Sequence, residues 1–140
     1  MIVIDIKPKS APRLTYQGRF KKEAKKYHEY KNELRLKLNK IELPQFFHIH
    51  FMIPMPKSWS KKKRANHMAQ LHMYKPDTDN LLKAFIDSLP PSFFEKFGMN
   101  DDKFIAYQSA TKWWTEKGCV IIEEKTMPIF PNVKAEHIFL

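Results

Sequence analysis

The sequence contains one cysteine, Cys119, among 140 residues, so the chain cannot form an internal disulfide. Such sparing use of cysteine is typical of proteins in reducing compartments. No apolar run approaches the roughly 20 residues that a membrane-spanning helix needs. The first ten residues, MIVIDIKPKS, lack the basic start, apolar run and cleavage site of a signal peptide. These absences predict a cytoplasmic protein without a membrane-spanning segment.

Acidic residues are also in short supply. The chain has 25 lysines and arginines against 15 aspartates and glutamates, which gives a formal net charge of +10. A positive excess of this size favours polyanionic partners such as DNA, RNA or a membrane surface, although it also keeps a protein soluble without any such partner. The hydrophobic fraction of 43% is sufficient for a globular core, so general disorder is not expected.

Hydrophobic periodicity predicts an α+β fold with a small mixed sheet and two main helices. Alternating patterns rich in β-branched and aromatic residues indicate strands at residues 2–6, 46–54, 101–114 and 119–124. The last two strands are expected to form a hairpin around the turn at residues 116–118. Apolar residues that recur every three or four positions predict helices at residues 20–41 and 79–89. We expect one domain over residues 1–140, with a core at about 2–125 and a C-terminal arm at 126–140.

Two histidines, His48 and His50, share one face of the strand at residues 46–54. Paired histidines can bind a metal ion, but no cysteine or third histidine stands at a familiar ligand spacing. Hydrogen bonding within the sheet is therefore the favoured role. Trp113 and Trp114 either pack at the end of the hairpin or stack on nucleic-acid bases.

The connection between residues 55 and 76 is long for a small domain, and such connections are usually functional or mobile. Ser60 is expected to cap a short helix that ends near Gln70. The basic run KKKR, at residues 61–64, fits a phosphate clamp, a solvated tip or a nuclear-localisation run.

The stretch KPDTDNLLKAFIDSL, at residues 75–89, is an amphipathic helix with an unusual front end. Its core face consists of Leu81, Leu82, Phe85, Ile86 and Leu89. Pro76 disfavours helix at the residue before it, so the helix should begin near Asp77 and Asp79. One aspartate there is explained as an N-cap, and Lys83 as an ordinary i,i+4 partner of Asp79. The other aspartate is less well explained.

A second acidic pair, Asp101 and Asp102, follows this helix. A turn would account for the pair. Alternatively, Asp102 and Asp101 lie beside Asp77 and Asp79, and the clustered carboxylates then need a cation. Hard oxygen ligands select Mg²⁺ or Mn²⁺ over zinc, and such an ion among lysines is suited to phosphodiester hydrolysis. From the residues alone, both alternatives stay open.

At these residues the sequence resembles the RusA family of Holliday junction resolvases. The resemblance consists of KPDTDNLLKAFIDSL, the DD pair that follows, and Lys112, ten residues beyond Asp102. It extends more weakly upstream, where KPKSAPRLTYQGRF and a helix rich in lysine and tyrosine resemble the family's N-terminal basic loop and first helix. It covers most of residues 2–125.

The resemblance implies roles for the acidic and basic residues of the motif. Asp77, Asp79 and Asp102 match the metal-binding aspartates, and Asp101 matches the acidic position beside them. Lys83 matches the catalytic lysine, which acts at the scissile phosphate or leaving group, while Asn80 and Asp87 match recurrent positions. The implied cofactor is Mg²⁺, for which Mn²⁺ can substitute.

The resemblance also implies a setting for this activity. The protein is expected to be a homodimer, encoded by a bacterium or phage and associated with the nucleoid in the cytoplasm. Its expected function is to resolve four-way DNA junctions by paired symmetric nicks, and two sites related by a two-fold axis suit such a junction.

We expect the DNA phosphates to be contacted by basic residues, so that binding weakens steeply with salt. The predicted contacts are Arg13, Arg19, Lys61, Lys62, Lys63, Arg64, Lys75 and Lys112. Two other functions remain open. The chain could be a non-catalytic junction-binding module whose aspartates only cap helices, or a metal-dependent nuclease that acts on flaps or RNA.

Overall fold

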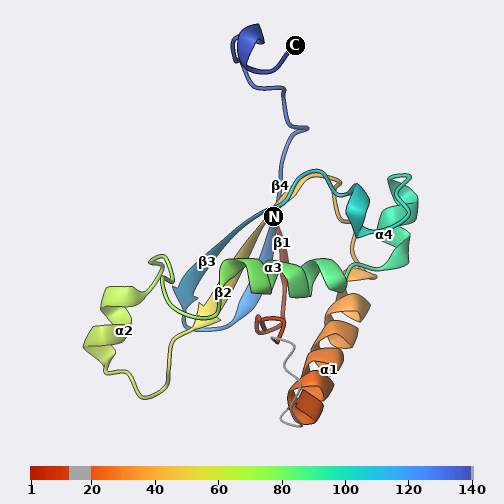
Figure 1. The fold of residues 1–140 in the computed structure, drawn as a ribbon. Helices are drawn as coiled ribbons and strands as arrows, with labels where there is room; N and C mark the ends of the chain where they lie inside the picture. The colour runs from red at the N-terminus through yellow and green to blue at the C-terminus, as the bar shows by residue number, and fades with distance from the viewer. Residues whose placement is uncertain (13–19, 140) are drawn as a thin grey trace.

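The computed structural model describes residues 1–12 and 20–139, which form an α+β fold (Figure 1). The helices are α1 (Phe20–Leu38), α2 (Lys61–His67), α3 (Thr78–Asp87) and α4 (Pro91–Lys96). The strands are β1 (Ile2–Ile4), β2 (Phe47–Pro54), β3 (Ser109–Thr115) and β4 (Cys119–Glu124), and the two short 3₁₀ helices are η1 (Asp102–Phe104) and η2 (Ala135–His137). The strands form one mixed sheet in the order β1-β4-β2-β3. The predicted class and the mixed sheet are confirmed.

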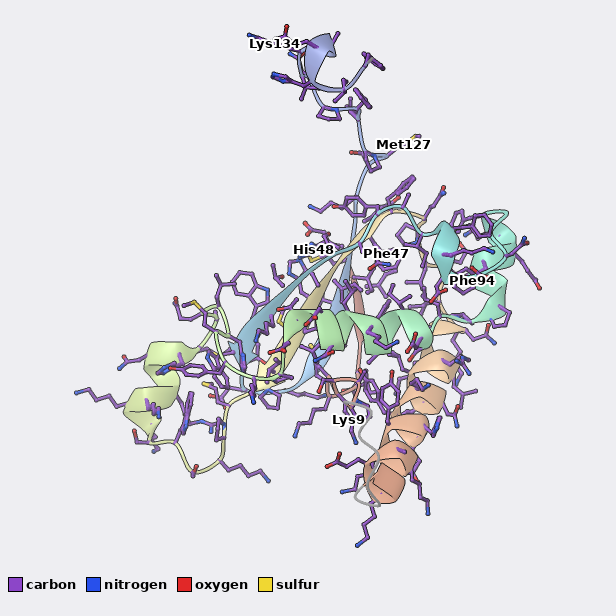
Figure 2. All side chains as sticks on the ribbon, in the orientation of Figure 1. Lys9, Phe47, His48, Phe94, Met127 and Lys134 are labelled. Atoms are coloured by element: carbon purple, nitrogen blue, oxygen red, sulfur yellow. The ribbon has the colours of Figure 1, made fainter. Side chains whose placement is uncertain are left out.

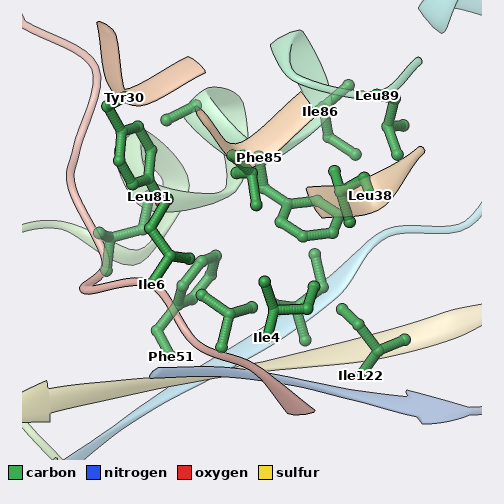
Figure 3. Close-up of a cluster of buried hydrophobic side chains, with 14 of the residues drawn as sticks. Ile4, Ile6, Tyr30, Leu38, Phe51, Leu81, Phe85, Ile86, Leu89 and Ile122 are labelled. Atoms are coloured by element: carbon green, nitrogen blue, oxygen red, sulfur yellow. The ribbon is translucent and has the colours of Figure 1, made fainter. Parts of the chain in front are cut away.

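The core lies between this sheet and the helices α1 and α3. In β2, Phe47, Ile49 and Phe51 are buried, whereas His48 and His50 are only half-buried, because successive side chains of a strand point to opposite faces. Figure 3 shows apolar side chains of the strands meeting those of the two helices in one cluster. On α3 the buried residues recur at helical spacing, as the sequence predicts. One face of α3 is therefore fixed against the sheet, and its opposite face is free for polar residues.

The predicted hairpin between β3 and β4 is wrong. The two strands do not pair, because β2 lies between them, parallel to β3 and antiparallel to β4. β2 is the longest strand and carries the most buried apolar face, so the central position satisfies its backbone on both edges. Gly118 allows the turn after β3 to cross the end of β2 closely, since a Cβ at this position would lie 3.1 Å from Cδ of Pro54.

The predicted strand at residues 101–114 is shorter than expected, because β3 begins only at Ser109. Asp101 precedes η1, and its carboxylate accepts a hydrogen bond of 2.9 Å from the backbone N–H of Lys103. Local bonds from an aspartate to the backbone compete with the ladder of a strand. Asp102 therefore opens a 3₁₀ turn. The preceding segment contains α4, which starts at Pro91 and buries Phe93.

Residues 126–139 form a C-terminal arm that extends away from the sheet, as the labelled Met127 and Lys134 show in Figure 2. The arm exposes several large apolar side chains, among them Ile129 and Phe130. No helix in the described part of the chain has the length and apolar character required to cross a membrane.

The fold predicts a large stability difference between two apolar truncations. Phe85→Ala should lower the free energy of unfolding by about 3–5 kcal/mol, because Phe85 is fully buried and its removal leaves a cavity between α3 and the sheet. Leu36→Ala on α1 is the matched control, since Leu36 is 66% exposed, and its effect should stay within about 0.5 kcal/mol. Urea unfolding followed by circular dichroism measures both changes. Equal effects of the two substitutions would contradict this packing.

Candidate functional site

Two aspartates stand at the start of α3, and both are exposed. Asp77 occupies the N-cap position, but its carboxylate accepts no capping hydrogen bond from the described residues. Asp79 lies in the first turn, where its Oδ1 accepts a bond of 3.0 Å from the N–H of Asn80. Helix capping therefore does not explain the Asp77 carboxylate. The helix N-terminus also favours negative charge at both positions.

Lys112 braces the backbone that leads into this acidic pair. Its ammonium donates to the carbonyl oxygen of Tyr74 and, at 2.7 Å, to that of Pro76. Burial lowers the pKa of Lys112, while the nearby Asp77 carboxylate acts in the opposite direction. Lys112, a predicted DNA contact, is therefore hydrogen-bonded in this structure to two backbone carbonyls just before Asp77.

Lys83 points along the polar face of α3, but its partner is not the one suggested by the spacing. Its ammonium lies 3.3 Å from Asp87 rather than pairing with Asp79. Asp87 also accepts a bond of 3.2 Å from the hydroxyl of Tyr27, and its carbonyl accepts one of 2.8 Å from Arg35. Burial and the Asp87 charge together raise the pKa of Tyr27. Asp87 thus joins α3 to α1, while Lys83 remains 63% exposed.

The second acidic pair lies at the opposite end of α3. Asp101 and Asp102 line an open hollow together with Asp87, Lys31 and Arg35. The ten residues of α3 extend over about 15 Å, which separates this hollow from the acidic residues at the start of the helix. Among residues 1–12 and 20–139, no group of three or more potential ligands is close enough to hold a metal ion. The structure thus brings together two pairs of aspartates and not one cluster of four.

A basic wing, residues 55–76, projects beside the start of α3 and includes α2 (Figure 1). Ser60 caps α2 as predicted, by accepting a bond of 3.2 Å from the N–H of Lys63. Lys61, Lys62, Lys63 and Lys75 are exposed. Arg64 differs, because its guanidinium donates to Glu116 at 2.6 Å and to the carbonyl of Pro56 at 2.7 Å. The predicted contacts Arg13 and Arg19 lie outside the described residues.

An aromatic cluster supports the wing. Trp114 is buried against Trp59, His72 and Tyr74, with ring centroids 4.8, 3.9 and 6.2 Å away. The ammonium of Lys63 lies 4.3 Å from the centre of the Trp59 ring. This cluster is not predictable from the sequence, because no spacing relates Trp59 to Trp114 and only the fold brings them together. For Trp114 the cluster decides in favour of packing over base stacking.

On the opposite face of the sheet, His48 and His50 are hydrogen-bonded as expected. His48 contacts Ser109 at 2.7 Å, and His50 contacts Glu123 at 3.0 Å. Burial and the neighbouring His50 lower the pKa of His48. The hydrogen bond from His50 lowers the pKa of Glu123. These histidines have protein partners, and the network lies across the sheet from α3.

His72 predicts a loss of stability in mild acid. Burial and the Lys112 ammonium lower the pKa of His72 below its usual value of 6.5. The unfolded chain therefore takes up a proton that the folded chain does not, so stability should fall as pH drops below about 6.5 towards the folded pKa. His72→Asn should flatten the plot of melting temperature against pH between 7.5 and 5.

The test compares the slopes of melting temperature against pH and not the melting temperatures themselves. His72→Asn also removes a packed ring, which lowers the melting temperature at every pH. His48 contributes a remaining slope of the same sign, since its pKa is lowered as well. His28→Asn on the exposed surface of α1 is the matched control for the loss of an imidazole. An unaltered slope in His72→Asn would show that His72 is not the source.

Comparison with known proteins identifies one family. The model of the family described as Endodeoxyribonuclease RusA matches residues 4–124, which include β1, both acidic pairs and β4. Neither the curated proteins nor the solved structures give a match. The description of the family is that of a nuclease that cuts DNA internally. Since the match spans most of the chain, this protein belongs to the RusA endodeoxyribonuclease family.

Proposed function

We propose that the protein is a Mg²⁺-dependent homodimeric endonuclease that resolves four-way DNA junctions by paired symmetric nicks. The observation that carries the proposal is the exposed acidic pair at the start of α3, in which the Asp77 carboxylate is not used for capping. Family membership supports the nuclease activity. The exposed lysines of the wing, beside this pair, supply the positive surface that a DNA backbone requires. A cytoplasmic, nucleoid-associated enzyme of a bacterium or phage fits this substrate.

The residues at the start of α3 suit Mg²⁺. This ion prefers oxygen ligands, retains several waters and is usually bound by one or two carboxylates together with substrate phosphates. Asp77, at the N-cap, and Asp79, in the first turn of α3, supply two such exposed carboxylates. When bound, Mg²⁺ would supply Lewis acidity that activates water and offsets negative charge on the phosphate.

The side chains of this chain have separate tasks in the proposed reaction. Asp77 and Asp79 hold the ion, and Lys112 fixes the backbone before them through the carbonyls of Tyr74 and Pro76. Lys83 lies one turn beyond Asp79 on the polar face and neutralises charge on the scissile phosphate or leaving oxygen. Its ion pair with Asp87 keeps the ammonium on that face when no phosphate is present.

We further propose that Asp102, accompanied by Asp101, reaches this site from the second protomer. Within one chain the two acidic pairs lie at opposite ends of α3, with Asp102 facing the hollow near Asp87. A two-fold dimer can bring the end of one α3 beside the start of the other. Each of the two sites would then combine Asp77 and Asp79 of one protomer with Asp102 of the other.

Asp79→Asn should abolish cleavage while leaving junction binding intact. The amide is a poorer ligand for Mg²⁺ than the carboxylate, whereas phosphate contacts come from lysines elsewhere. We expect cleavage of a synthetic four-way junction in Mg²⁺ to fall roughly 100-fold or more. Gel electrophoresis of end-labelled strands measures the nicks, and mobility shift in Ca²⁺ measures binding. Glu136→Gln on the arm makes the same change in charge and should cleave normally.

The same substrates separate the alternatives. Symmetric paired nicks support junction resolution, whereas preferential cutting of flaps or RNA supports a different nuclease. Binding without any cleavage by the wild-type protein supports a junction-binding module. Full activity of Asp79→Asn would exclude the acidic pair as the metal site.

A mixed dimer tests whether the site is shared. Separately tagged Asp79→Asn and Asp102→Asn chains can be co-expressed and the heterodimer purified by both tags. If the site is shared, one of the two sites in the heterodimer carries both substitutions and the other carries none. The unsubstituted site stays active, so the junction is nicked on one strand. With sites formed within each chain, every site is damaged and neither strand is cut. We expect single nicks, scored on denaturing gels.

A further inference from the structure

We propose that Met73 and Tyr74 form an apolar wedge that stacks on unpaired bases at the centre of the four-way junction. The inference rests on the proposed function and names a contact for it that the metal site does not supply. Met73 is 80% exposed and Tyr74 is 66% exposed, and they are adjacent. They stand three to four residues before Asp77 in the chain. Single exposed apolar residues are common on protein surfaces, and these two differ in how firmly their backbone is held.

The segment that carries the wedge is fixed to the edge of the sheet. Residues 69–72 run beside β3, where the N–H of His72 donates to the carbonyl of Lys112 at 3.0 Å and the N–H of Trp114 donates to the carbonyl of Gln70 at 2.9 Å. Ala69 adopts a φ of 63° where the chain leaves α2 for this edge, a conformation that costs energy for a residue with a Cβ. The path of the chain from α2 along β3 to α3 is visible in Figure 1.

Both ends of the wedge are secured. On one side, the His72 ring is buried with its centroid 3.9 Å from that of Trp114. On the other side, the ammonium of Lys112 holds the carbonyls of Tyr74 and Pro76. The Tyr74 ring packs at its edge against this buried cluster and leaves most of its surface in solvent. A rigid exposed ring of this kind loses little conformational entropy when a base stacks on it.

The surrounding charge favours nucleic acid as the occupant. The wing contains six lysines and arginines and no aspartate or glutamate. A protein that bound the apolar patch would not require basic residues around it. A base, in contrast, brings its phosphates with it, and the surrounding lysines and arginines neutralise them. Aromatic rings stack on any base, and apolar side chains, methionine included, insert between base steps and kink the duplex.

The spacing along the chain matches the spacing along a DNA strand. Three residues separate Tyr74 from Asp77, which corresponds to at most about 11 Å of extended chain. Successive nucleotides in one strand are about 3.4 Å apart along the helix axis. A base on Tyr74 therefore lies within about three nucleotides of the phosphate at the acidic pair. Opening of the strand at this distance exposes the backbone at the crossover to the metal site.

The test uses a junction with 2-aminopurine beside the crossover. Wild-type protein in Ca²⁺ should raise the fluorescence as the base unstacks from its neighbours. The Met73→Ala/Tyr74→Ala double variant should lose this rise, and its cleavage of the fully paired junction in Mg²⁺ should fall roughly tenfold. On a junction with unpaired nucleotides at its centre the deficit should shrink to about twofold. Tyr74→Phe should behave like the wild-type protein, because it retains the stacking face.

The matched control is Ile129→Ala/Phe130→Ala, which removes two similarly exposed apolar side chains from the arm and should change neither signal. A double variant that raises the fluorescence and cleaves like the wild-type protein would overturn the wedge. An equal loss of cleavage on the fully paired and the open junctions would also overturn the wedge. Light scattering tests a third outcome. If the double variant turns a dimer into a monomer, the patch is a protein interface, and the wedge proposal is overturned. A wild-type protein that cuts no junction yet raises the fluorescence would reject the proposed function while supporting the wedge.

Discussion

The parallel pairing of β2 with β3 is the constraint on which the site depends. With β2 between β3 and β4, β3 is left at the edge of the sheet, and its outer backbone groups are free to bind the returning segment of the wing. The same register turns Lys112 towards the carbonyls of Tyr74 and Pro76. The position of the acidic pair thus follows from strand order.

Charge is distributed so that the acidic pairs are surrounded by positive surface. The charged side chains of the wing are all basic, Lys112 contacts the backbone just before Asp77, and Lys83 lies one turn beyond Asp79 on α3. Two carboxylates at a helix N-terminus are stabilised by the helix dipole, which lowers the cost of keeping them together without a cation. A cation that binds them changes the local charge enough to attract a phosphate. In the proposed function, the net charge of +10 attracts the polyanion, and the acidic pair determines where the strand is cut.

Local patterns in the sequence predicted the elements but not their assembly. The apolar stripe of α3, the alternation in β2 and the Ser60 cap depend on neighbouring residues, so local patterns were sufficient to identify them. The position of β2 between β3 and β4 depends on pairing between residues far apart, which periodicity does not encode. The same limit applies to the aromatic cluster around Trp114 and to Arg64, whose partner Glu116 lies 52 positions away. The motif gave the positions of the acidic residues in the chain, whereas their separation along α3 within one chain is visible only in the fold.

The separation of Asp102 from the acidic pair has a consequence for control of the proposed nuclease. A chain that carries two carboxylates at its metal site holds Mg²⁺ less firmly than one that carries three, because each carboxylate adds both charge and an inner ligand. Where the third carboxylate comes from a second protomer, dimerisation and metal binding strengthen one another by the same factor, as linkage requires. A lone protomer on intact duplex DNA then lacks a complete site. In the proposed reaction, a four-way junction whose symmetry matches that of the proposed dimer would present two strands to two complete sites at once.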